Sequence, residues 1–543
     1  MFLDEYIDEN YKIKTPEHFN FAFDVVDRFA TEEPEKIALV WCDDKKDEKI
    51  LTFSQMAKNV NKTANVLKSL GIKKGDSVML ILRRRYEFWY MLLALHKIGA
   101  IAVPATVQLL TSDIVYRIEK AHIKMIVALN DEQVVEHIEN ALEEFSTKPE
   151  NLEKIPQLLL ANGNKEGWID FENQFEKASE TFADIRCAEN FDTSILYFTS
   201  GTSGYPKMVT HNFFYPLGHI VTAKCWQNVQ ENGLHLSLAE TGWAKALWGK
   251  IYGQWLCGCG VFAYDMETFI PKKVLEHLQN YKVTSFCAPP TAYRYLLRED
   301  FSHYDLSSLT QCTTAGEALT QDIFDTFKKQ TGITLREGYG QTELTLTSGN
   351  FPWVEVRVGS MGVASPNYDV DVIRPDGTSC NPDEVGEIIV RIDKSKPLGM
   401  FSGYYEDEEK TRQAFSDGIY HTGDSGRKDQ DGYFWFEGRT DDMIKSSGFR
   451  ISPFEVESVL LNHPAVFECA VTGIKDDRRG QIVKATIVVK EGFKPCRDLA
   501  REIKLFAKKN TANYKTPRLI EFVDELPKTH SGKIRRVEIR NKK

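Results

Sequence analysis

The sequence predicts an α/β protein. Its large N-terminal part carries parallel βαβ sheets with helices, a small β-rich subdomain follows, and a small α+β domain ends the chain. Strand and helix patterns alternate over residues 36–130, short strands and turns follow residue 363, and a mixed pattern runs from residue 442 onward. Because parallel strands need crossover helices, the alternation predicts sheets that helices cover on both faces.

The first strand–helix units can be placed individually. A strand pattern over 36–41 is followed by Thr52 and Gln55, whose spacing matches a capping box at the start of a helix. Apolar residues then recur at helical spacing up to Leu67, and Gly71 supplies the stop. Further strands are predicted at 77–82 and 100–103, with a helix at 86–98 between them.

Later elements follow from the same patterns. Residues 132–180 are polar and charge-rich, which predicts exposed helices and loops before a buried strand at 195–198. The remaining predicted strands are 260–264, 284–288, 370–373, 387–392, 466–472 and 482–489, and the remaining helices are 271–281, 452–461 and 499–508.

The size and net charge of the chain limit the class of protein to which it can belong. With 543 residues, 42% of them hydrophobic, the chain can bury large cores and should form several units. The net charge of −10 argues against a nucleic-acid binder, which would normally present a basic surface. No nucleic-acid partner is therefore expected.

Cysteine usage and hydropathy indicate a soluble cytoplasmic protein. The ten cysteines form no CxxC pair, which favours buried thiols in a reducing cytosol over a metal site. The acidic N-terminal residues do not resemble a secretory signal. The most apolar stretch, 89–107, contains His96, Lys97, Gly99 and Pro104, which makes it a poor membrane span.

A cluster of hydroxyl-bearing residues and glycines follows the strand at 195–198. Gly201 and Gly204 allow the backbone N–H groups to approach an anion, and Lys207 adds a positive charge. The stretch suits a polyphosphate, although it lacks the Walker pattern and a flexible surface turn is an equal alternative. The hydroxyl donors are Thr199, Ser200, Thr202 and Ser203.

Two later stretches combine glycines with an aromatic ring and oxygen ligands. Gly316 and Gly338 would let the backbone approach a flat ring, on which Tyr339 could stack. Thr342 and Glu343 form an oxygen cluster suited to a hard cation, whereas a lone glutamate is usually a solvated surface charge.

Six motifs, taken in order, resemble those of the adenylate-forming superfamily of acyl-CoA synthetases, luciferases and peptide-synthetase adenylation domains. They are TSGTSGYPK at 199–207, TTAGEA at 313–318, REGYGQTE at 336–343, YHTGD at 420–424, EGRTDDMIKSSGFR at 437–450 and PKTHSGK at 527–533. They span nearly the whole chain, and the greatest similarity is to the medium-chain acyl-CoA synthetases.

This resemblance implies an AMP-forming acid–thiol ligase of fatty acid metabolism. ATP and a carboxylic acid would form an acyl-adenylate and pyrophosphate, and coenzyme A would then displace AMP. The implied partners are a small carboxylic acid, ATP, CoA and Mg²⁺. The oligomeric state stays open, with a homodimer as one alternative.

The resemblance also implies the roles of individual residues. The loop 199–207 would neutralise the triphosphate, Glu343 beside Thr342 would bind magnesium, and Lys533 would reach the reacting carboxylate as the catalytic cation. The nucleoside would be held by Gly316, Glu317, Ala318, Tyr339, Gly340, Asp424 and Arg439.

A mobile C-terminal domain is part of the same expectation. Residues 1–438 would form the adenylation domain, 439–441 a hinge at Asp441, and 442–543 the mobile domain. Rotation about the hinge would remove Lys533 and present a CoA-binding face. The residues predicted on that face are Ser447, Gly448, Arg450 and Arg479.

The acyl pocket is predicted from four residues. Related acetyl-CoA synthetases carry a tryptophan at the position of Gly340, so the glycine predicts acids larger than acetate or propionate. Trp243, Trp248 and Cys287 would end the pocket, and two indoles favour a medium-chain or branched short-chain acid. Tryptophans at this spacing are otherwise core residues more often than ligand contacts. The role of Lys245 is left open.

Other functions compete with this prediction. One alternative is an aryl or other carboxylate–CoA ligase, and another is an adenylating enzyme with an acceptor other than CoA. A peptide-synthetase adenylation domain would need an acid to pair with an α-ammonium group, for which Glu240 is the nearby candidate. A non-catalytic nucleotide sensor is disfavoured because Glu343, Asp424 and Lys533 are all present.

Overall fold

The computed structural model describes residues 2–183, 186–199, 206–317, 319–440, 442–446, 449–476, 478–528 and 534–541. The described chain divides into two compact units. Unit 1 comprises the residues up to 199 together with 207–368 and 395–411, and unit 2 comprises 369–394 and the residues from 412 onward. The predicted boundary at 439–441 falls inside unit 2 and stays a prediction.

The first sheet of unit 1 is parallel at its centre. Strands β14 to β1 run parallel to one another, whereas β2, β15 and β16 add antiparallel edges. In sheet order the strands are β16 (Ser360–Ala364), β15 (Ser348–Gly349), β14 (Leu335–Tyr339), β13 (Gln311–Ala315), β12 (Ser285–Cys287), β10 (Leu234–Ser237), β11 (Gly260–Asp265), β1 (Ile37–Asp43) and β2 (Glu48–Thr52).

The second sheet of unit 1 ends in two antiparallel strands. The predicted strand at 195–198 is β8, which pairs antiparallel with β9, and β9 pairs antiparallel with β19. In sheet order the strands are β19 (Gly403–Tyr404), β9 (Lys207–Asn212), β8 (Thr193–Thr199), β4 (Ile101–Pro104), β3 (Ser77–Ile81), β5 (Ile123–Leu129), β6 (Gln157–Ala161) and β7 (Ile169–Asp170).

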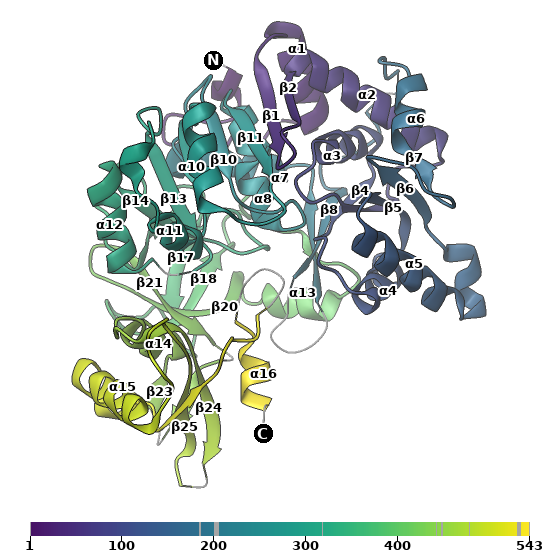
Figure 1. Ribbon diagram of the computed structural model, residues 1–543. Helices are drawn as coiled ribbons and strands as arrows, with labels where there is room; N and C mark the ends of the chain where they lie inside the picture. Colours follow the sequence, from purple (N-terminus) through teal and green to yellow (C-terminus); the bar gives the residue numbers. More distant parts are fainter. Residues whose placement is uncertain are drawn as a thin grey trace. The chain divides into compact units, whose positions relative to one another are not determined.

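Helices accompany both sheets, and α12 lies beside β14 (Figure 1). The predicted capping box is confirmed, because Thr52 accepts from the Gln55 backbone and Gln55 accepts from the Thr52 backbone. The helices are α1 (Arg28–Glu32), α2 (Phe53–Ser69), α3 (Glu87–Ile98), α4 (Thr111–Lys120), α5 (Glu132–Ser146), α6 (Phe171–Lys177), α7 (Tyr215–Val221), α8 (Ala244–Gly249), α9 (Tyr252–Leu256), α10 (Pro271–Asn280), α11 (Pro290–Leu296) and α12 (Gln321–Thr331), with α13 (Glu408–Ala414) crossing residue 411.

Unit 2 contains two sheets. One is antiparallel, in the order β17 (Asp369–Ile373), β18 (Gly386–Arg391), β20 (Ile419–Lys428) and β21 (Phe434–Arg439). In the other sheet the strands are, in order, β23 (Phe449–Ile451), β22 (Ile444–Ser446), β25 (Gly480–Val489) and β24 (Val466–Asp476). β26 (Leu519–Phe522) pairs parallel with β25. Its helices are α14 (Pro453–Leu461), α15 (Arg497–Asn510) and α16 (Arg536–Asn541).

The predicted α/β fold class is confirmed, but two local predictions were incomplete. The stretch 132–180 was expected to be exposed helices and loops, yet it contributes β6, whose last three residues are buried in the second sheet. The sheets are mixed where parallel ones were expected, because the antiparallel strands β2, β15 and β16 of the first sheet and β9 and β19 of the second were not recognised. Short strands such as β19 carry too little periodicity to be detected.

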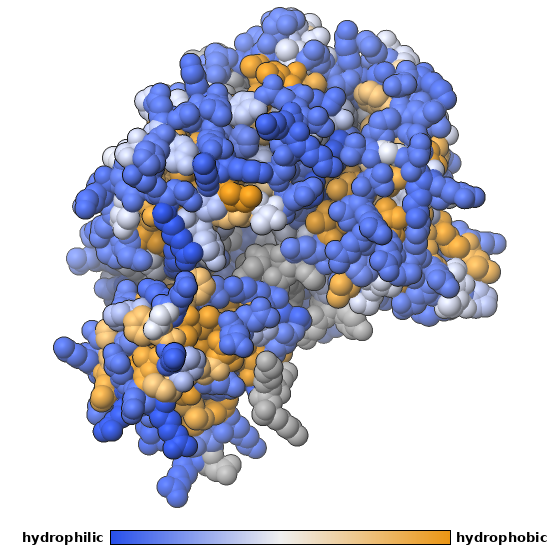
Figure 2. Space-filling view, viewed as in Figure 1, coloured by the Kyte–Doolittle hydropathy of each residue, from blue (hydrophilic) through white to orange (hydrophobic). Residues whose placement is uncertain are grey.

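The apolar residues are used for packing. Every residue of α3, which lies in the most apolar stretch of the chain, is buried. Among the described residues, no helix has both the length and the apolar character needed to cross a membrane. The face shown in Figure 2 is mainly hydrophilic, with smaller groups of hydrophobic residues.

Candidate active site

The predicted ring-binding motifs come together at one edge of the first sheet. β13 and β14 are parallel neighbours, with Ala315 opposite Gly338. Gly316 and Gly340 therefore follow the carboxyl ends of adjacent strands, where open α/β sheets commonly bind ligands. Gly316 has a φ of +100°, a conformation that side-chain-bearing residues rarely adopt. The predicted role of Ala318 falls outside the described residues.

Two side chains contact the segment after β13. Lys245 donates a hydrogen bond to the carbonyl of Ala315, so it is held by the protein rather than simply solvated. Thr291 donates to the Glu317 carboxylate at 2.6 Å. Both contacts position the predicted nucleoside-binding segment from neighbouring elements.

Tryptophan rings cover the glycines of β14 and the turn after it. A Cβ at Gly340 would lie 2.4 Å from Cη2 of Trp248 and 2.4 Å from the carbonyl oxygen of Thr345. A Cβ at Gly338 would lie 2.7 Å from Cε2 of Trp226, a tryptophan that belongs to none of the motifs. Side chains at either glycine would collide, because real Cβ contacts are almost never this short.

The other predicted pocket residues lie close to these glycines in the topology. Cys287 is buried at the end of β12, opposite Thr313 of β13. Trp243 is half-buried and immediately precedes α8, the helix that carries Trp248. The structure thus brings Trp248 against Gly340 and places Cys287 two strands away from β14.

The oxygen cluster after β14 is tied to β9 and to the segment that precedes β19. His211 of β9 lies 2.8 Å from the carbonyl oxygen of Thr342 through its Nε2. Burial lowers the pKa of His211 to about 3, so the ring is neutral and donates from Nε2. The backbone N–H of Phe401 donates to the Glu343 carbonyl at 2.8 Å.

Tyr404 connects Glu343 to the predicted phosphate loop. Its hydroxyl donates to Oε1 of Glu343 at 3.0 Å and accepts from Nζ of Lys207 at 3.4 Å. Lys207 is the first residue of β9 and lies opposite Thr199, the last residue of β8. The predicted contacts of Ser200, Gly201, Thr202, Ser203 and Gly204 fall outside the described residues.

These residues fit a divalent cation that binds mainly through phosphates. Glu343 is half-buried, and its carboxylate is oriented by the Tyr404 hydroxyl. One carboxylate beside a hydroxyl is the kind of oxygen donor set that Mg²⁺ uses when substrate phosphates supply the other ligands. Among the described residues, no group of three histidine, cysteine or carboxylate side chains could hold a metal.

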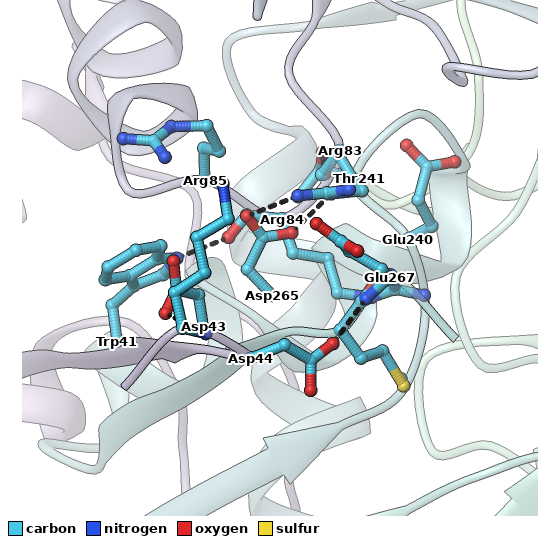
Figure 3. Close-up of polar contacts among 12 residues, drawn as sticks. Trp41, Asp43, Asp44, Arg83, Arg84, Arg85, Glu240, Thr241, Asp265 and Glu267 are labelled. Carbon is cyan, nitrogen blue, oxygen red and sulfur yellow. Dashed lines mark hydrogen bonds and ion pairs between the residues drawn. The ribbon is translucent and has the colours of Figure 1, made fainter. Parts of the chain in front are cut away.

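A cluster of charged residues around the buried Asp265 fixes the loop that leads to Trp243. Figure 3 shows the Arg83 guanidinium against the Asp265 carboxylate, with Arg84, Thr241 and Glu240 nearby. Arg83 pairs with Asp265 at 2.6 Å, and its carbonyl accepts from the Thr241 backbone N–H at 3.2 Å. Half-buried Arg84 donates to the carbonyl oxygens of Leu238 at 3.2 Å and Met266 at 3.4 Å.

Glu240 belongs to this cluster. Burial raises its pKa to about 7, and the charge of Arg84 is the main opposing influence. Its carboxylate accepts from the Gly242 backbone N–H at 3.2 Å. Glu240 therefore has intramolecular partners, which weakens its candidacy as the partner of a substrate ammonium group.

In unit 2 the two predicted nucleotide contacts pair with each other. Asp424 of β20 lies opposite Arg439 of β21, and Nη1 of Arg439 donates to Oδ1 of Asp424 at 2.9 Å. The turn before Asp424 is anchored by Glu387, which accepts from the Gly423 backbone at 3.2 Å and contacts His421 at 3.0 Å. Glu387 was not recognised from the sequence, because an isolated glutamate in a strand carries no motif.

The predicted CoA face also lies in unit 2. β22 and β23 form a hairpin, and Ser446 of β22 pairs with Gly480 of β25. This pairing places the exposed Arg479 next to the hairpin that carries Arg450 in β23. Ser447, Gly448, Asp441 and Lys533 fall outside the described residues.

Known proteins resemble this chain over nearly its whole length. The family described as AMP-binding enzyme matches residues 26–405, and the family described as AMP-binding enzyme C-terminal domain matches 455–533. Acyl-coenzyme A synthetase ACSM3, mitochondrial, of Homo sapiens is 37% identical over 547 residues, covering 99% of this chain and 92% of the relative.

Two further proteins extend these comparisons. Acyl-coenzyme A synthetase ACSM4, mitochondrial, of Homo sapiens is 39% identical over 535 residues, covering 97% of this chain and 91% of the relative. The crystal structure of the anthranilate CoA ligase AuaEII in complex with anthranoyl-AMP superimposes with a TM-score of 0.86 at 31% identity, covering 97% of each chain.

Proposed function

This chain belongs to the AMP-binding enzyme family, and from that membership we propose that it is an AMP-forming acyl-CoA synthetase. The enzyme uses ATP, Mg²⁺ and CoA to convert a carboxylic acid into its CoA thioester. The observation that carries the proposal is the alignment of both family models and of acyl-CoA synthetase relatives over nearly the whole chain.

The chemistry has two steps. The carboxylate of the acid attacks the α-phosphate of ATP, and the bond to pyrophosphate breaks to leave an acyl-adenylate. The thiol of CoA then attacks the acyl carbon, the bond to AMP breaks, and the thiol proton is released. A bound magnesium ion would neutralise charge on the phosphates during the first step.

Different residues of the chain would bind the magnesium ion, the phosphates, the nucleoside and the reacting carboxylate. Glu343, oriented by Tyr404, would hold the magnesium ion, and Lys207 and the loop 199–207 would bind phosphate oxygens. Gly316 follows β13, and Tyr339 is the last residue of the neighbouring strand β14. Both would contact the base, while Asp424 would accept hydrogen bonds from the ribose hydroxyls. Lys533 would stabilise charge on the reacting carboxylate and phosphate.

We assign the size limit of the acyl pocket to Trp248. The sequence predicts that Gly340 removes a wall of the pocket, but the space next to Gly340 is filled by the indole of Trp248. The wall of the proposed pocket is therefore Trp248 of α8. It lies farther from the backbone of residue 340 than a side chain at residue 340 itself would. This supports a branched short-chain or medium-chain acid as substrate.

The test is pyrophosphate release with ATP, magnesium and acids from acetate to dodecanoate, including 2-methylbutyrate, with and without CoA. We expect sustained turnover only with CoA and a maximum at a mid-sized or branched acid. Trp248→Ala should move that maximum by one or more methylenes, with a change in relative kcat/KM of about 5- to 100-fold. An unchanged profile would contradict the role of Trp248, and no turnover with any acid would contradict the synthetase function.

An aryl acid is the second candidate substrate. The specific observation is the similarity to AuaEII, whose crystal structure contains anthranoyl-AMP. Benzoate and anthranilate therefore belong in the same panel. A maximum with either acid would favour the aryl–CoA ligase function.

The domain and compartment predictions complete the proposal. Residues 1–438 and 442–543 would act as adenylation and mobile domains joined by a hinge at 439–441. A cytosolic location is proposed because the ten cysteines are free thiols, which suit a reducing compartment. The relatives named above are mitochondrial, so fractionation of cells into cytosol and mitochondria would test this part.

A further inference from the structure

We propose that Tyr404 is a positioning residue that orients the Glu343 carboxylate for metal binding and keeps Lys207 from pairing with it. The inference rests on the proposed function, because it gives Glu343 a metal and Lys207 a phosphate. Tyr404 belongs to none of the recognised motifs and lies 61 residues from Glu343 in the sequence.

The backbone of Tyr404 is firmly placed. β19 pairs antiparallel with β9, with Gly403 opposite Thr210 and Tyr404 opposite Val209. The hydroxyl of Thr210 donates to the Gly403 carbonyl at 2.8 Å, and the Tyr404 backbone N–H donates to Thr411 at 2.9 Å. With 9% of its surface exposed, the side chain is confined to one direction.

The hydroxyl of Tyr404 lies between two opposite charges. It accepts from the Lys207 ammonium at 3.4 Å and donates to the Glu343 carboxylate at 3.0 Å. The Lys207 nitrogen also lies 5.0 Å from the centroid of the Tyr404 ring, within range of a cation–π contact. A direct lysine–carboxylate pair would neutralise both groups, whereas an intervening hydroxyl leaves each charge available to the substrate complex.

The main chain around Glu343 does not depend on Tyr404. The Glu343 carbonyl accepts from the Phe401 backbone, and the Thr342 carbonyl accepts from His211. Loss of the Tyr404 hydroxyl should therefore leave the turn in place and release only the carboxylate. Tyr404→Phe removes that hydroxyl while it keeps the ring that packs near Phe401 at 5.0 Å.

The experiment measures binding of α,β-methylene-ATP, which cannot transfer AMP, by calorimetry with Mn²⁺ and with EDTA. For Tyr404→Phe we expect roughly tenfold weaker binding with Mn²⁺, in line with loss of a hydrogen bond to a charged group. Binding in EDTA should change less than twofold. Tyr405→Phe is the matched control, because it removes a hydroxyl one residue away and should behave as wild type.

Kinetics provide an independent readout. Tyr404→Phe should raise the magnesium concentration needed for half-maximal pyrophosphate release, while CoA thioester formation from isolated acyl-adenylate keeps its rate. A Glu343→Gln/Tyr404→Phe double variant should bind the Mn²⁺ complex no more weakly than Glu343→Gln alone, since Tyr404 acts through Glu343.

Three results would overturn the inference. They are unchanged Mn²⁺-dependent binding in Tyr404→Phe, equal weakening with Mn²⁺ and with EDTA, and additive losses in the double variant. Failure of the synthetase function would give a different result, because the wild-type protein would then release no pyrophosphate with any acid. The comparison of nucleotide binding between wild type and Tyr404→Phe would still test the role of Tyr404.

Discussion

Burial changes the chemistry of individual carboxyl groups in this protein. Glu337 lies within the motif at 336–343, is 6% exposed, and has a pKa that burial raises to about 8. The Leu319 backbone N–H donates to its carboxyl group at 3.2 Å, which ties β14 to the segment after Gly316. Glu337 is thus a protonated structural residue in a motif whose last member, Glu343, is a predicted metal ligand.

The raised pKa of Glu337 predicts how stability varies with pH. Above pH 4.5, the ordinary pKa of a glutamate, the unfolded state loses this proton while the folded state keeps it. The contribution of Glu337 to stability is therefore complete below pH 4.5 and is lost as the pH rises toward about 8. Between pH 6 and 8, the free energy of unfolding of the wild type should therefore fall by about 2–3 kcal/mol more than that of Glu337→Gln. This magnitude follows because one pKa unit corresponds to about 1.4 kcal/mol.

Denaturant unfolding of both proteins at pH 6, 7 and 8 measures this difference. Glu176→Gln, which changes an exposed glutamate of α6, should follow the wild-type curve. Parallel curves for wild type and Glu337→Gln would show that Glu337 is ionised in the folded protein.

At the scale of elements, segments distant in sequence hold the active-site loops. The residues after β3 place Arg83 and Arg84 under the loop 238–242, where they bind the carbonyl of Leu238 and the backbone of Thr241 (Figure 3). This loop leads to Trp243 and to α8, which carries Trp248. The position of the proposed pocket wall thus depends on charged residues that follow β3, a strand of the second sheet.

Arg84→Met should destabilise the protein by about 1–3 kcal/mol, because the hydrogen bonds from its guanidinium to the carbonyls of Leu238 and Met266 are lost together with the positive charge that favours ionised Glu240. Thermal or denaturant unfolding at pH 8 measures the change, since Glu240, with a pKa of about 7, is then mainly ionised. Arg84→Met/Glu240→Gln is the control and should recover part of the loss. A double variant that is less stable than Arg84→Met would contradict the coupling.

At the scale of the whole molecule, the function requires one chain to perform two half-reactions. Both predicted sets of C-terminal residues belong to unit 2: the CoA face near Arg479 and the segment that carries Lys533. The residues after Lys533 are anchored within unit 2, where Arg536 pairs with the buried Glu457 at 2.6 Å. This anchor would allow the lysine to move together with its domain.

Lys533→Ala should separate the two half-reactions. Pyrophosphate release should fall about 10²- to 10³-fold, as expected for loss of one well-placed electrostatic stabiliser, whereas thioester formation from isolated acyl-adenylate should change only a few-fold. Stopped assays of each half-reaction measure this ratio. Equal losses in both would contradict the alternation of domains about the hinge.

The sequence by itself determined the elements and motifs that depend on near neighbours. The capping box of Thr52 and Gln55, the helix later found at Glu87–Ile98 and the six motifs could be located because their signals span only a few residues. The family and its two-step chemistry followed from the order of those motifs, and the comparisons confirm both.

The tertiary structure alone decided which side chains meet. Trp248 against Gly340, Lys245 on the carbonyl of Ala315, and Tyr404 between Lys207 and Glu343 all join residues that are far apart in the sequence. Such contacts depend on the order of strands in a sheet, and strand periodicity shows which face of a strand is buried but not which strand lies beside it. The two-residue strand β19 therefore shows its role only once it is paired with β9.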